Sequence, residues 1–213
     1  MDPQQAVPIV LNGPGLRVLI VGGGAVGARR ATSLVQAGAT VRVVTIQQRA
    51  TLPAEASVEL RPFKPSDVDG ANLVVAATDD PTANASVGDA AKQRNVLCCR
   101  ADVSESGEVL FARKVTAGPM VAGVVSGSPT MSGRAVEAVR QTLEPLAEFA
   151  RAQSSIRSLV KASSGNAAQK QAVMSDAASA EAEAAWESDG IDGLRLWLAG
   201  RHEWLRSALI ETW

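Results

Sequence analysis

The feature that most constrains the fold is a strand–turn–helix pattern near the start of the chain. Residues 17–21 form a short apolar run of the kind found in buried parallel strands. The run leads into Gly22, Gly24 and Gly27, which have the G-x-G-x-x-G spacing. In a dinucleotide-binding turn these glycines permit the turn, the approach of a pyrophosphate and the close packing of helix on strand. The pattern predicts such a site, and a glycine-rich turn that binds nothing is the alternative.

Strands and helices alternate after this turn, which favours a doubly wound, Rossmann-type parallel sheet within residues 1–112. The pattern then changes to two extended segments around an Ala-Gly-Pro turn, followed by alanine-rich helices. We therefore predict an α/β fold class with three parts: a nucleotide-binding domain at 1–112, a small β-containing module at 113–145 and an all-α domain at 146–213. The predicted strands cover residues 17–21, 40–44, 57–63, 72–78 and 95–99, and the predicted helices of the first part cover 25–38 and 81–94.

Composition narrows the classes of partner and compartment. The 213 residues carry a formal net charge of −1, so no global positive field favours nucleic acid or an anionic membrane. The first 15 residues lack the features of a signal peptide, and no run approaches the ~18 apolar residues of a membrane span. Cys98 and Cys99 are adjacent and His202 is the only histidine, so we expect no metal site and a cytoplasmic location.

The second predicted strand lacks the acidic residue that commonly binds the cofactor ribose. It runs into Thr-Ile-Gln-Gln-Arg, so a ribose contact has to come from Thr45, Gln47 or the backbone. Arg42 or Arg49 would suit the extra phosphate of NADP. For Arg49, however, the sequence favours a solvated charge in a loop over a phosphate contact. Spacing alone does not separate NAD from NADP. The predicted cofactor-binding residues are Gly22, Gly24, Ala25, Val26, Gly27, Thr45, Ile46, Gln47, Ala77, Thr78 and Asp79.

Two stretches and one aspartate resemble a known family. The stretches are VLIVGGGAVGARRATSLVQAGATVRVV and LVVAATDDPTAN, and the aspartate follows the fifth predicted strand. In this order they are similar to the precorrin-2 dehydrogenase family, which includes the dehydrogenase/ferrochelatase module of siroheme synthase. The resemblance implies NAD-dependent oxidation of the tetrapyrrole precorrin-2 to sirohydrochlorin, on the way to siroheme or cobalamin. It also implies a homodimer built through residues 113–145.

The resemblance also implies roles for individual residues. Asp102 stands where the family keeps an aspartate essential for its chemistry, as a general base or a group that orients the macrocycle; spacing alone would favour a turn-forming residue. Ser126 aligns with a serine near the substrate, although its loop is shorter here and Ala112 replaces a common proline. Because the substrate carries many carboxylates, basic side chains should line its site. The predicted substrate-binding residues are Ser126, Arg113, Lys114 and Arg134, with Arg140 as a further candidate.

Two functional alternatives stay open at this point. One is a regulatory module that senses NAD(H) through the Rossmann domain and contacts a partner through the helices. The other is an enzyme that also inserts iron or cobalt, because some members of the family are chelatases and need only an acidic group near the macrocycle. Turnover of precorrin-2 with NAD separates the enzyme from the sensor.

Overall fold

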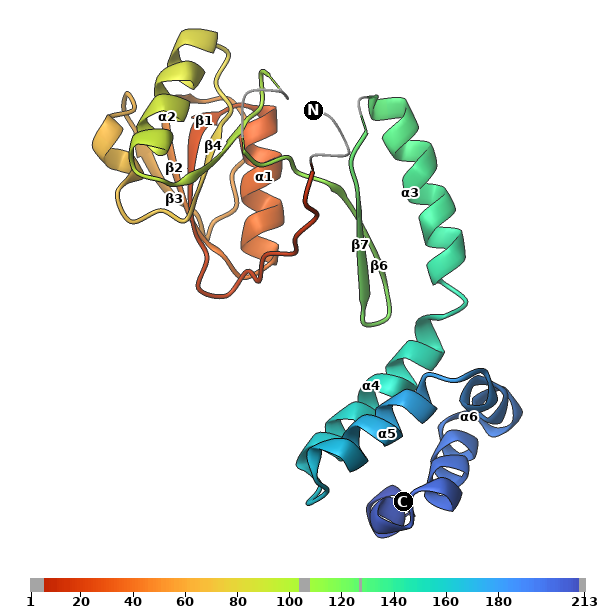
Figure 1. Cartoon of the computed structure of the whole chain (residues 1–213). Helices are drawn as coiled ribbons and strands as arrows, with labels where there is room; N and C mark the ends of the chain where they lie inside the picture. The colour runs from red at the N-terminus through yellow and green to blue at the C-terminus, as the bar shows by residue number, and fades with distance from the viewer. Residues whose placement is uncertain (1–5, 104–107, 127, 211–213) are drawn as a thin grey trace. The chain divides into compact units, whose positions relative to one another are not determined.

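The chain forms two compact units, Met1–Ala112 and Arg113–Trp213 (Figure 1). The structure is a computed structural model that describes residues 6–103, 108–126 and 128–210. The finer division of the second unit at residue 145 stays a prediction.

The first unit is built on a five-stranded sheet with the order β3-β2-β1-β4-β5, in which every neighbouring pair is parallel. The chain leaves β1 towards β2 and β3 on one side, then returns to place β4 and β5 on the other. Sheets of this kind bind ligands at the carboxyl ends of the strands where the order reverses, here between β1 and β4. The predicted Rossmann-type sheet is thus confirmed. Its elements are β1 (Arg17–Gly23), α1 (Ala25–Gln36), β2 (Thr40–Gln48), β3 (Ser57–Leu60), the 3₁₀ helix η2 (Pro65–Val68), β4 (Leu73–Ala76), α2 (Pro81–Gln93) and β5 (Leu97–Arg100).

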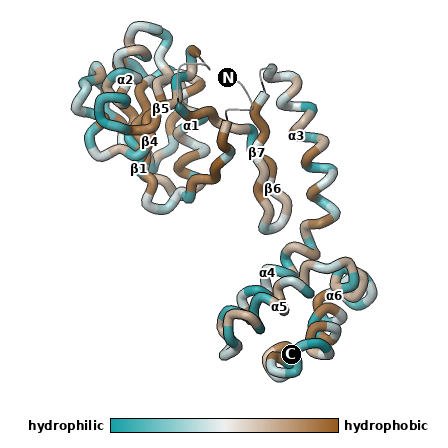
Figure 2. Tube along the Cα trace, in the orientation of Figure 1, coloured by the Kyte–Doolittle hydropathy of each residue, from teal (hydrophilic) through white to brown (hydrophobic). Residues whose placement is uncertain are grey.

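Apolar side chains pack on both faces of the sheet. The strands are correspondingly coloured as hydrophobic in Figure 2. Ala31 and Leu34 of α1 pack on one face, and Val87 and Ala90 of α2 pack on the other. The two cysteines divide between these faces, because successive side chains of a strand point in opposite directions. Cys99 joins the α1 cluster and Cys98 joins the α2 cluster. Burial raises the pKa of both thiols, to about 12 for Cys98.

Two strands end earlier than the sequence predicts. β3 ends at Leu60 instead of residue 63, because Arg61 N–H makes the last bond to β2, at Thr45 O (2.9 Å), and Pro62 has no N–H to continue the ladder. β4 ends at Ala76 instead of residue 78, where the chain turns into the loop before α2. Both shortened ends leave loop residues free to line the carboxyl edge of the sheet.

The second unit consists of an antiparallel hairpin and a set of helices. Gly118 makes the turn of the hairpin with a φ of +54°, a conformation that glycine adopts without strain. The helices from α4 onward enclose their own apolar core, which includes Ile156, Leu194 and Leu198. None of the described helices is long and apolar enough to cross a membrane. The elements are β6 (Arg113–Ala117), β7 (Met120–Val124), α3 (Pro129–Leu143), α4 (Ala147–Ala162), α5 (Ala167–Ala177), α6 (Ala180–Arg201), the 3₁₀ helix η3 (Glu203–Leu205) and α7 (Arg206–Ile210).

Helix caps and breaks in this unit follow the sequence. Asn166 and Ser179 cap α5 and α6 by accepting hydrogen bonds from backbone N–H groups of the first turn. A kink lies inside α6, where Asp189 and Gly190 leave the helical conformation. The predicted α-helical C-terminal region and the small β element before it are therefore both confirmed.

Candidate functional site

The glycine turn between β1 and α1 has a different physical requirement at each of its three positions. Gly22 has a φ of +118°, and a Cβ there would lie 2.2 Å from Ala77 O at the end of β4. A Cβ on Gly27 would lie 2.2 Å from Gly22 O, so helix and strand could not pack. A Cβ on Gly24 would meet nothing within 4 Å. Packing therefore requires Gly22 and Gly27, whereas Gly24 leaves its backbone open to a ligand.

The start of α1 suits an anion. Gly24 is the N-cap, it supplies no side-chain hydrogen bond to the helix, and the first turn contains no acidic residue. The first N–H groups of a helix lack intrahelical partners, and the helix dipole gives this end a partial positive charge. A pyrophosphate at Gly24 would meet both, so the turn fits the phosphate part of a dinucleotide.

Two adjoining cavities lie at the carboxyl edge of the sheet, and they share the walls formed by Gly24, Ala77, Thr78 and Asp79. The larger, of about 580 Å³, extends along the ends of β1, β2 and β4 and the loop after β3. The smaller, of about 220 Å³, is completed by Ala25, Val26, Ala101 and Asp102. Every predicted cofactor-binding residue except Gly27 lines one cavity or both, and Gly27 packs beneath the turn.

The loop after β4 is held by Asn84, a residue that the sequence analysis did not single out. Asn84 is fully buried on α2; its Oδ1 accepts hydrogen bonds from Thr78 N (3.0 Å) and Thr78 Oγ1 (2.8 Å). Its Nδ2 donates to Thr78 O (3.1 Å). Asp80 caps α2 by accepting from Thr82 N (2.8 Å). The TDDPTAN motif thus fixes one wall of the cavities; the Asn six residues after the Thr was the available sequence signal.

The end of β2 is also engaged in local contacts. Thr45 is buried, and its hydroxyl donates to Gln47 O (2.9 Å). Arg49 donates from Nε to Gln47 Oε1 (3.0 Å) and forms an ion pair with Asp79 (2.6 Å). The Arg49–Asp79 pair therefore joins the loops after β2 and β4, on opposite sides of the larger cavity. Of the predicted ribose contacts, Thr45 is occupied by its own turn, and Gln47 is oriented by Arg49.

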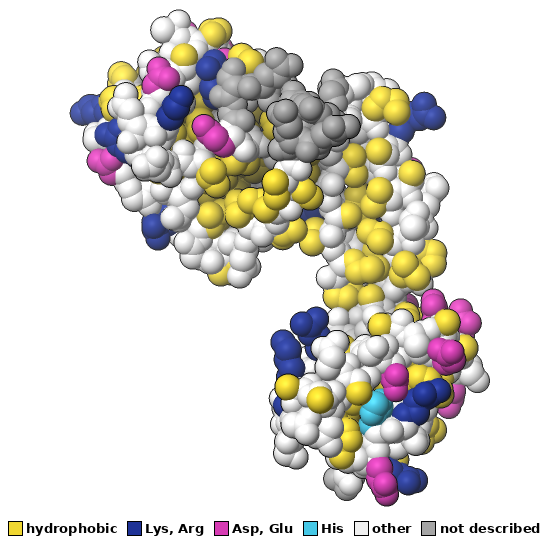
Figure 3. Space-filling model, in the orientation of Figure 1, with side chains coloured by type: hydrophobic (Ala, Val, Ile, Leu, Met, Phe, Trp, Pro, Cys, Tyr) yellow, Lys and Arg dark blue, Asp and Glu magenta, His cyan; other side chains and the backbone are white. Residues whose placement is uncertain are grey.

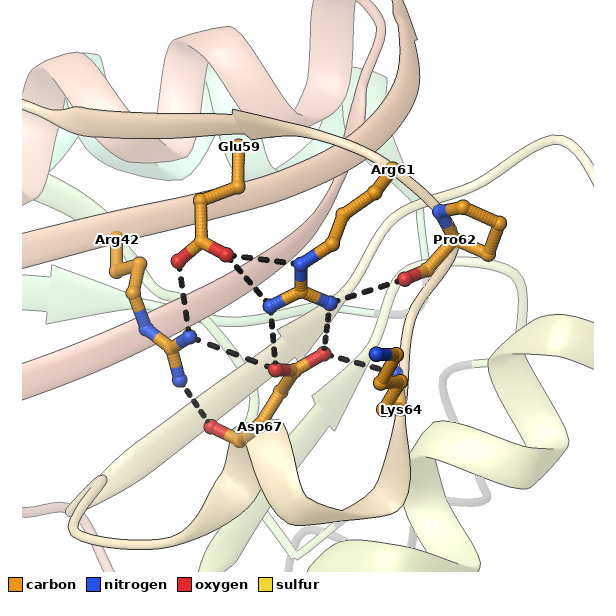
Figure 4. Close-up of polar contacts among 6 residues, drawn as sticks. All are labelled: Arg42, Glu59, Arg61, Pro62, Lys64 and Asp67. Carbon is orange, nitrogen blue, oxygen red and sulfur yellow. Dashed lines mark hydrogen bonds and ion pairs between the residues drawn. The ribbon is translucent and has the colours of Figure 1, made fainter.

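The outer wall of the larger cavity is held by a network of ion pairs (Figure 4). Asp67 is buried, and its two carboxylate oxygens accept hydrogen bonds from Arg61 at 2.7 and 2.8 Å. Arg61 also binds Glu59 (2.6 Å), and Arg42 binds Glu59 (3.1 Å) and the Asp67 carbonyl. The guanidinium of Arg61 lowers the pKa of Asp67 to about 2, and the two acids raise the pKa of Arg61. The network holds the loop containing Pro62 and Phe63 against the cavity.

Asp102 lines the smaller cavity, and its carboxylate forms an ion pair with Arg100 at the end of β5. Arg100 Nε donates to Asp102 Oδ1 (3.2 Å), and its Nη2 donates to Oδ2 (2.7 Å). The two side chains are only 16% and 17% exposed. The guanidinium holds the pKa of Asp102 below its ordinary value, and a hydrogen bond from Asn84 acts in the same direction. Sequence reasoning found Asp102 and overlooked Arg100, although the i, i+2 spacing of opposite charges at a strand end was visible.

The predicted substrate residues lie in the second unit. Arg113 and Lys114 are exposed on β6, and Arg134 is exposed on α3. Ser126 precedes α3; its hydroxyl donates to Ser128 O (2.7 Å) and lies 2.6 Å from the buried Ser132 hydroxyl. These contacts match turn chemistry, and the substrate role of all four residues stays a prediction. Across the described ranges, no group of three or more His, Cys, Asp or Glu is arranged to hold a metal ion.

Comparison with known proteins shows similarity to an NAD(P)-binding family model and to several siroheme synthases. A family model described as "Putative NAD(P)-binding" matches residues 9–113. Siroheme synthase from Pseudomonas entomophila is 39% identical over 126 residues, which is 57% of this chain and 27% of that protein. Siroheme synthase from Chromobacterium violaceum is 34% identical over 163 residues, 73% of this chain and 35% of that protein. The chain thus matches only about a quarter to a third of the length of these relatives.

A solved structure resembles the whole chain. The protein described as SirC, precorrin-2 dehydrogenase, superposes with a TM-score of 0.69 at 20% identity and covers 98% of this chain and 100% of its own. At this identity the match shows that the two folds are alike along the chain.

The sheet order, the glycine turn and the cavities at its edge define a Rossmann-type protein that binds a nicotinamide dinucleotide. Residues 9–113 match the NAD(P)-binding family model, and the chain is similar in sequence to part of the siroheme synthases. The resemblance to the precorrin-2 dehydrogenase family that the sequence predicted is therefore confirmed.

Proposed function

We propose that this chain oxidises precorrin-2 to sirohydrochlorin with NAD as the acceptor. The observation that carries the proposal is the shared wall of the two cavities, which places Asp102 beside the glycine turn at one edge of the sheet. A dinucleotide with its phosphates at Gly24 would extend into both cavities. The names of the siroheme synthase relatives and of the SirC structure support the choice of substrate.

The residues divide into those that bind the cofactor and one that faces the substrate. Gly24 and the start of α1 would hold the pyrophosphate, and Thr78, fixed by Asn84, lines both cavities beside them. A bound nicotinamide would supply the acceptor for a hydride, and the substrate would release one proton to water, so the oxidation balances at two electrons. Arg100 lowers the pKa of Asp102, which favours the carboxylate form, and this carboxylate would accept a hydrogen bond from an N–H group of the macrocycle.

NAD fits the larger cavity better than NADP because the arginines that line it are already paired. Arg61 is bound by Glu59 and Asp67, and Arg49 is bound by Asp79. A 2′-phosphate near Arg49 would have to displace Asp79 and would then lie close to that carboxylate. The variant Asp79→Asn frees Arg49, so we expect NADPH to bind at least about 5-fold more tightly to it than to the wild type, with NADH affinity changed less. Fluorescence titration with both cofactors measures this difference.

We also propose that the chain forms a homodimer through its second unit. Apolar side chains remain exposed on the hairpin and the neighbouring helices, where hydrophobic groups gather in the face shown in Figure 3. Val121 and Val125 are each 46% exposed, and Met131 is 52% exposed. Light scattering should give twice the chain mass for the wild type and a single chain mass for Val121→Glu. The matched control Leu196→Glu, at a 52% exposed site on α6, should stay dimeric.

The reaction is tested by incubating the purified full chain with precorrin-2 and NAD and following the appearance of NADH. We expect turnover by the wild type and loss of at least about 100-fold in Asp102→Asn, with NADH binding retained. Binding of NADH without turnover by the wild type would contradict the dehydrogenase and favour the NAD(H)-sensing module. Full activity of Asp102→Asn would remove Asp102 from the site.

A further inference from the structure

The contact between Arg100 and Asp102 has a geometry that isolated surface pairs lack. Both nitrogens of one guanidinium edge face both oxygens of the carboxylate, at 3.2 and 2.7 Å. Such two-point contacts fix the orientation of both groups, and arginine stays charged at every accessible pH. Because both side chains are less than one-fifth exposed, water screens the pair less than it screens a surface pair.

The backbone and the neighbouring helix hold this pair at the cavity. Ala101 N–H donates to Ala76 O (2.9 Å), which continues the β4–β5 pairing to the residue between Arg100 and Asp102. The stem of Arg100 packs on α2 at Gly88, where a Cβ would come within 3.4 Å of Arg100 Cδ. The side-chain stem of Arg100 therefore lies close to the surface of α2.

Charged groups on the adjoining elements reinforce the pairing. Asp89 of α2 adds to the effect of Asp102 in raising the pKa of Arg100. Asn84, also on α2, and Arg100 both lower the pKa of Asp102. Glu108 faces β5 at the backbone of Cys98, where it accepts a hydrogen bond from the N–H (3.2 Å). Among the described neighbours, Arg100 is therefore the cation that directly contacts the Asp102 carboxylate.

We propose that Arg100 is a positioning residue that holds Asp102 ionised and in a fixed orientation at the smaller cavity. Asp102 then acts as a standing hydrogen-bond acceptor for a substrate N–H group and not as the base that removes a proton, because a carboxylate paired in this way is a weaker base. The assignment of Asp102 to the substrate rests on the proposed function, whereas the effect of Arg100 on Asp102 does not.

The test uses the full chain with Arg100→Met and Arg100→Lys, and its first measurement is independent of turnover. Carboxyl-carbon NMR of aspartate-labelled protein, assigned with Asp102→Asn, gives the titration of Asp102 itself. We expect the titration midpoint of Asp102 to rise in Arg100→Met, and to rise less in Arg100→Lys, because lysine keeps the charge but cannot make the two-point contact. The matched control is Arg94→Met, which removes an arginine that pairs with Asp69 away from the cavities.

The second measurement is the pH profile of dehydrogenation. In Arg100→Met the acidic limb of kcat should move up by the same amount as the NMR midpoint, with the KM for NAD unchanged within about 2-fold. In Arg100→Lys the acidic limb should move up less than in Arg100→Met, while kcat stays reduced about 10-fold because the orientation is lost. A purely structural role for Arg100 would lower kcat at every pH and leave the limb in place.

Distinct outcomes separate the two proposals. An Asp102 midpoint that is the same in wild type and Arg100→Met overturns the positioning role, whatever the activity. If the Asp102 midpoint rises in Arg100→Met as expected, but the wild type does not turn over precorrin-2, the proposed function is overturned and the pairing of Arg100 with Asp102 is supported. Bound NADH in each variant, measured by fluorescence, shows that the domain is folded.

Discussion

The two units differ in how far their ion pairs reach along the chain. In the first unit several pairs join separate elements, alongside short-range pairs such as Arg100–Asp102, and some of both kinds lie at the edge of the sheet where the cavities are. In the second unit, among the residues that the structure describes, most pairs lie within one turn of a helix, and the exception is His202 with Asp176 (3.0 Å). The long-range pairs are Arg42–Glu59, Arg42–Asp67, Arg49–Asp79 and Arg94–Asp69, and the local pairs are Arg140–Glu137, Arg151–Glu148 and Arg195–Asp192.

This difference shows that the two units are stabilised for different tasks. A cavity formed by loop ends needs those loops in fixed positions, and partly buried two-point contacts such as Arg61–Asp67 supply that. A helical unit is held together mainly by its apolar core, and local exposed pairs add little to it. Four substitutions, described from the largest expected effect to the smallest, test this contrast.

Leu198→Ala should destabilise the helical unit most. Leu198 is fully buried among α4 to α7, so its truncation removes apolar contacts and leaves a cavity. We expect a loss of about 3 kcal/mol in the free energy of unfolding of this unit. Denaturant unfolding followed by tryptophan fluorescence reports it directly, because all tryptophans lie beyond residue 185. NADH affinity should not change; a parallel loss of affinity would mean that the cavities depend on this core.

Gly22→Ala should disrupt the first unit at the glycine turn. The φ of +118° and the 2.2 Å approach to Ala77 O both oppose a side chain, so we expect about 2–3 kcal/mol of destabilisation and loss of NADH binding. Hydrogen exchange of the sheet amides measures the stability. Gly24→Ala is the matched control, since its Cβ would meet open space. It should weaken NADH binding while leaving amide protection unchanged, and equal destabilisation by both variants would contradict the division of roles.

Asp67→Asn should change how the first unit responds to acid. The pKa of Asp67 is about 2 in the folded state and ~4 when unfolded, so its pairing stabilises the fold above pH 4, and this contribution disappears as the pH falls to about 2. After allowance for screening we expect the variant to be about 1–2 kcal/mol less stable at pH 7. In denaturant titrations, the difference in the free energy of unfolding between the wild type and Asp67→Asn should disappear as the pH falls from 4 to 2. A difference that is the same at pH 4 and pH 2 would contradict the pairing of Asp67.

Arg151→Ala should have the smallest effect of the four. Arg151 pairs with Glu148 three residues earlier on α4, and both side chains are more than half exposed. The free energy of unfolding of the helical unit should change by less than about 0.5 kcal/mol. A loss as large as that expected for Asp67→Asn would remove the contrast between local and long-range pairs.

Much of the first unit could be predicted because its sequence signals are local. Apolar strands, a glycine turn and proline at the first position of α2 are set by the backbone preferences of consecutive residues. The residues that line the cavities could then be predicted as well, because the carboxyl ends of parallel strands lie at the same edge of the sheet. The departures were at strand ends, which depend on where neighbouring strands stop pairing: β3 and β4 end earlier than predicted, β1 and β2 end later, and β5 begins and ends later.

The side-chain partners within the site could not be predicted in the same way. Asn84 and Arg100 each stand at a spacing that was visible in the sequence, but the spacing does not specify the hydrogen bonds that they make to Thr78 and Asp102 in the folded chain. Similarly, Thr45 was expected at the ribose, whereas its hydroxyl closes its own turn, a local choice available to any threonine at a strand end. Residue type and spacing identified the position of the site but not the hydrogen bonds that orient it.

The opposite orientations of Cys98 and Cys99 have a practical consequence. These are the only cysteines of the chain; they lie in the first unit, while every tryptophan lies in the second. Both thiols are buried, and the raised pKa of each keeps it protonated and unreactive while the sheet is intact. A thiol reagent therefore reports opening of the sheet, while indole emission reports opening of the helices. One sample of unlabelled wild-type protein can thus reveal which unit opens first.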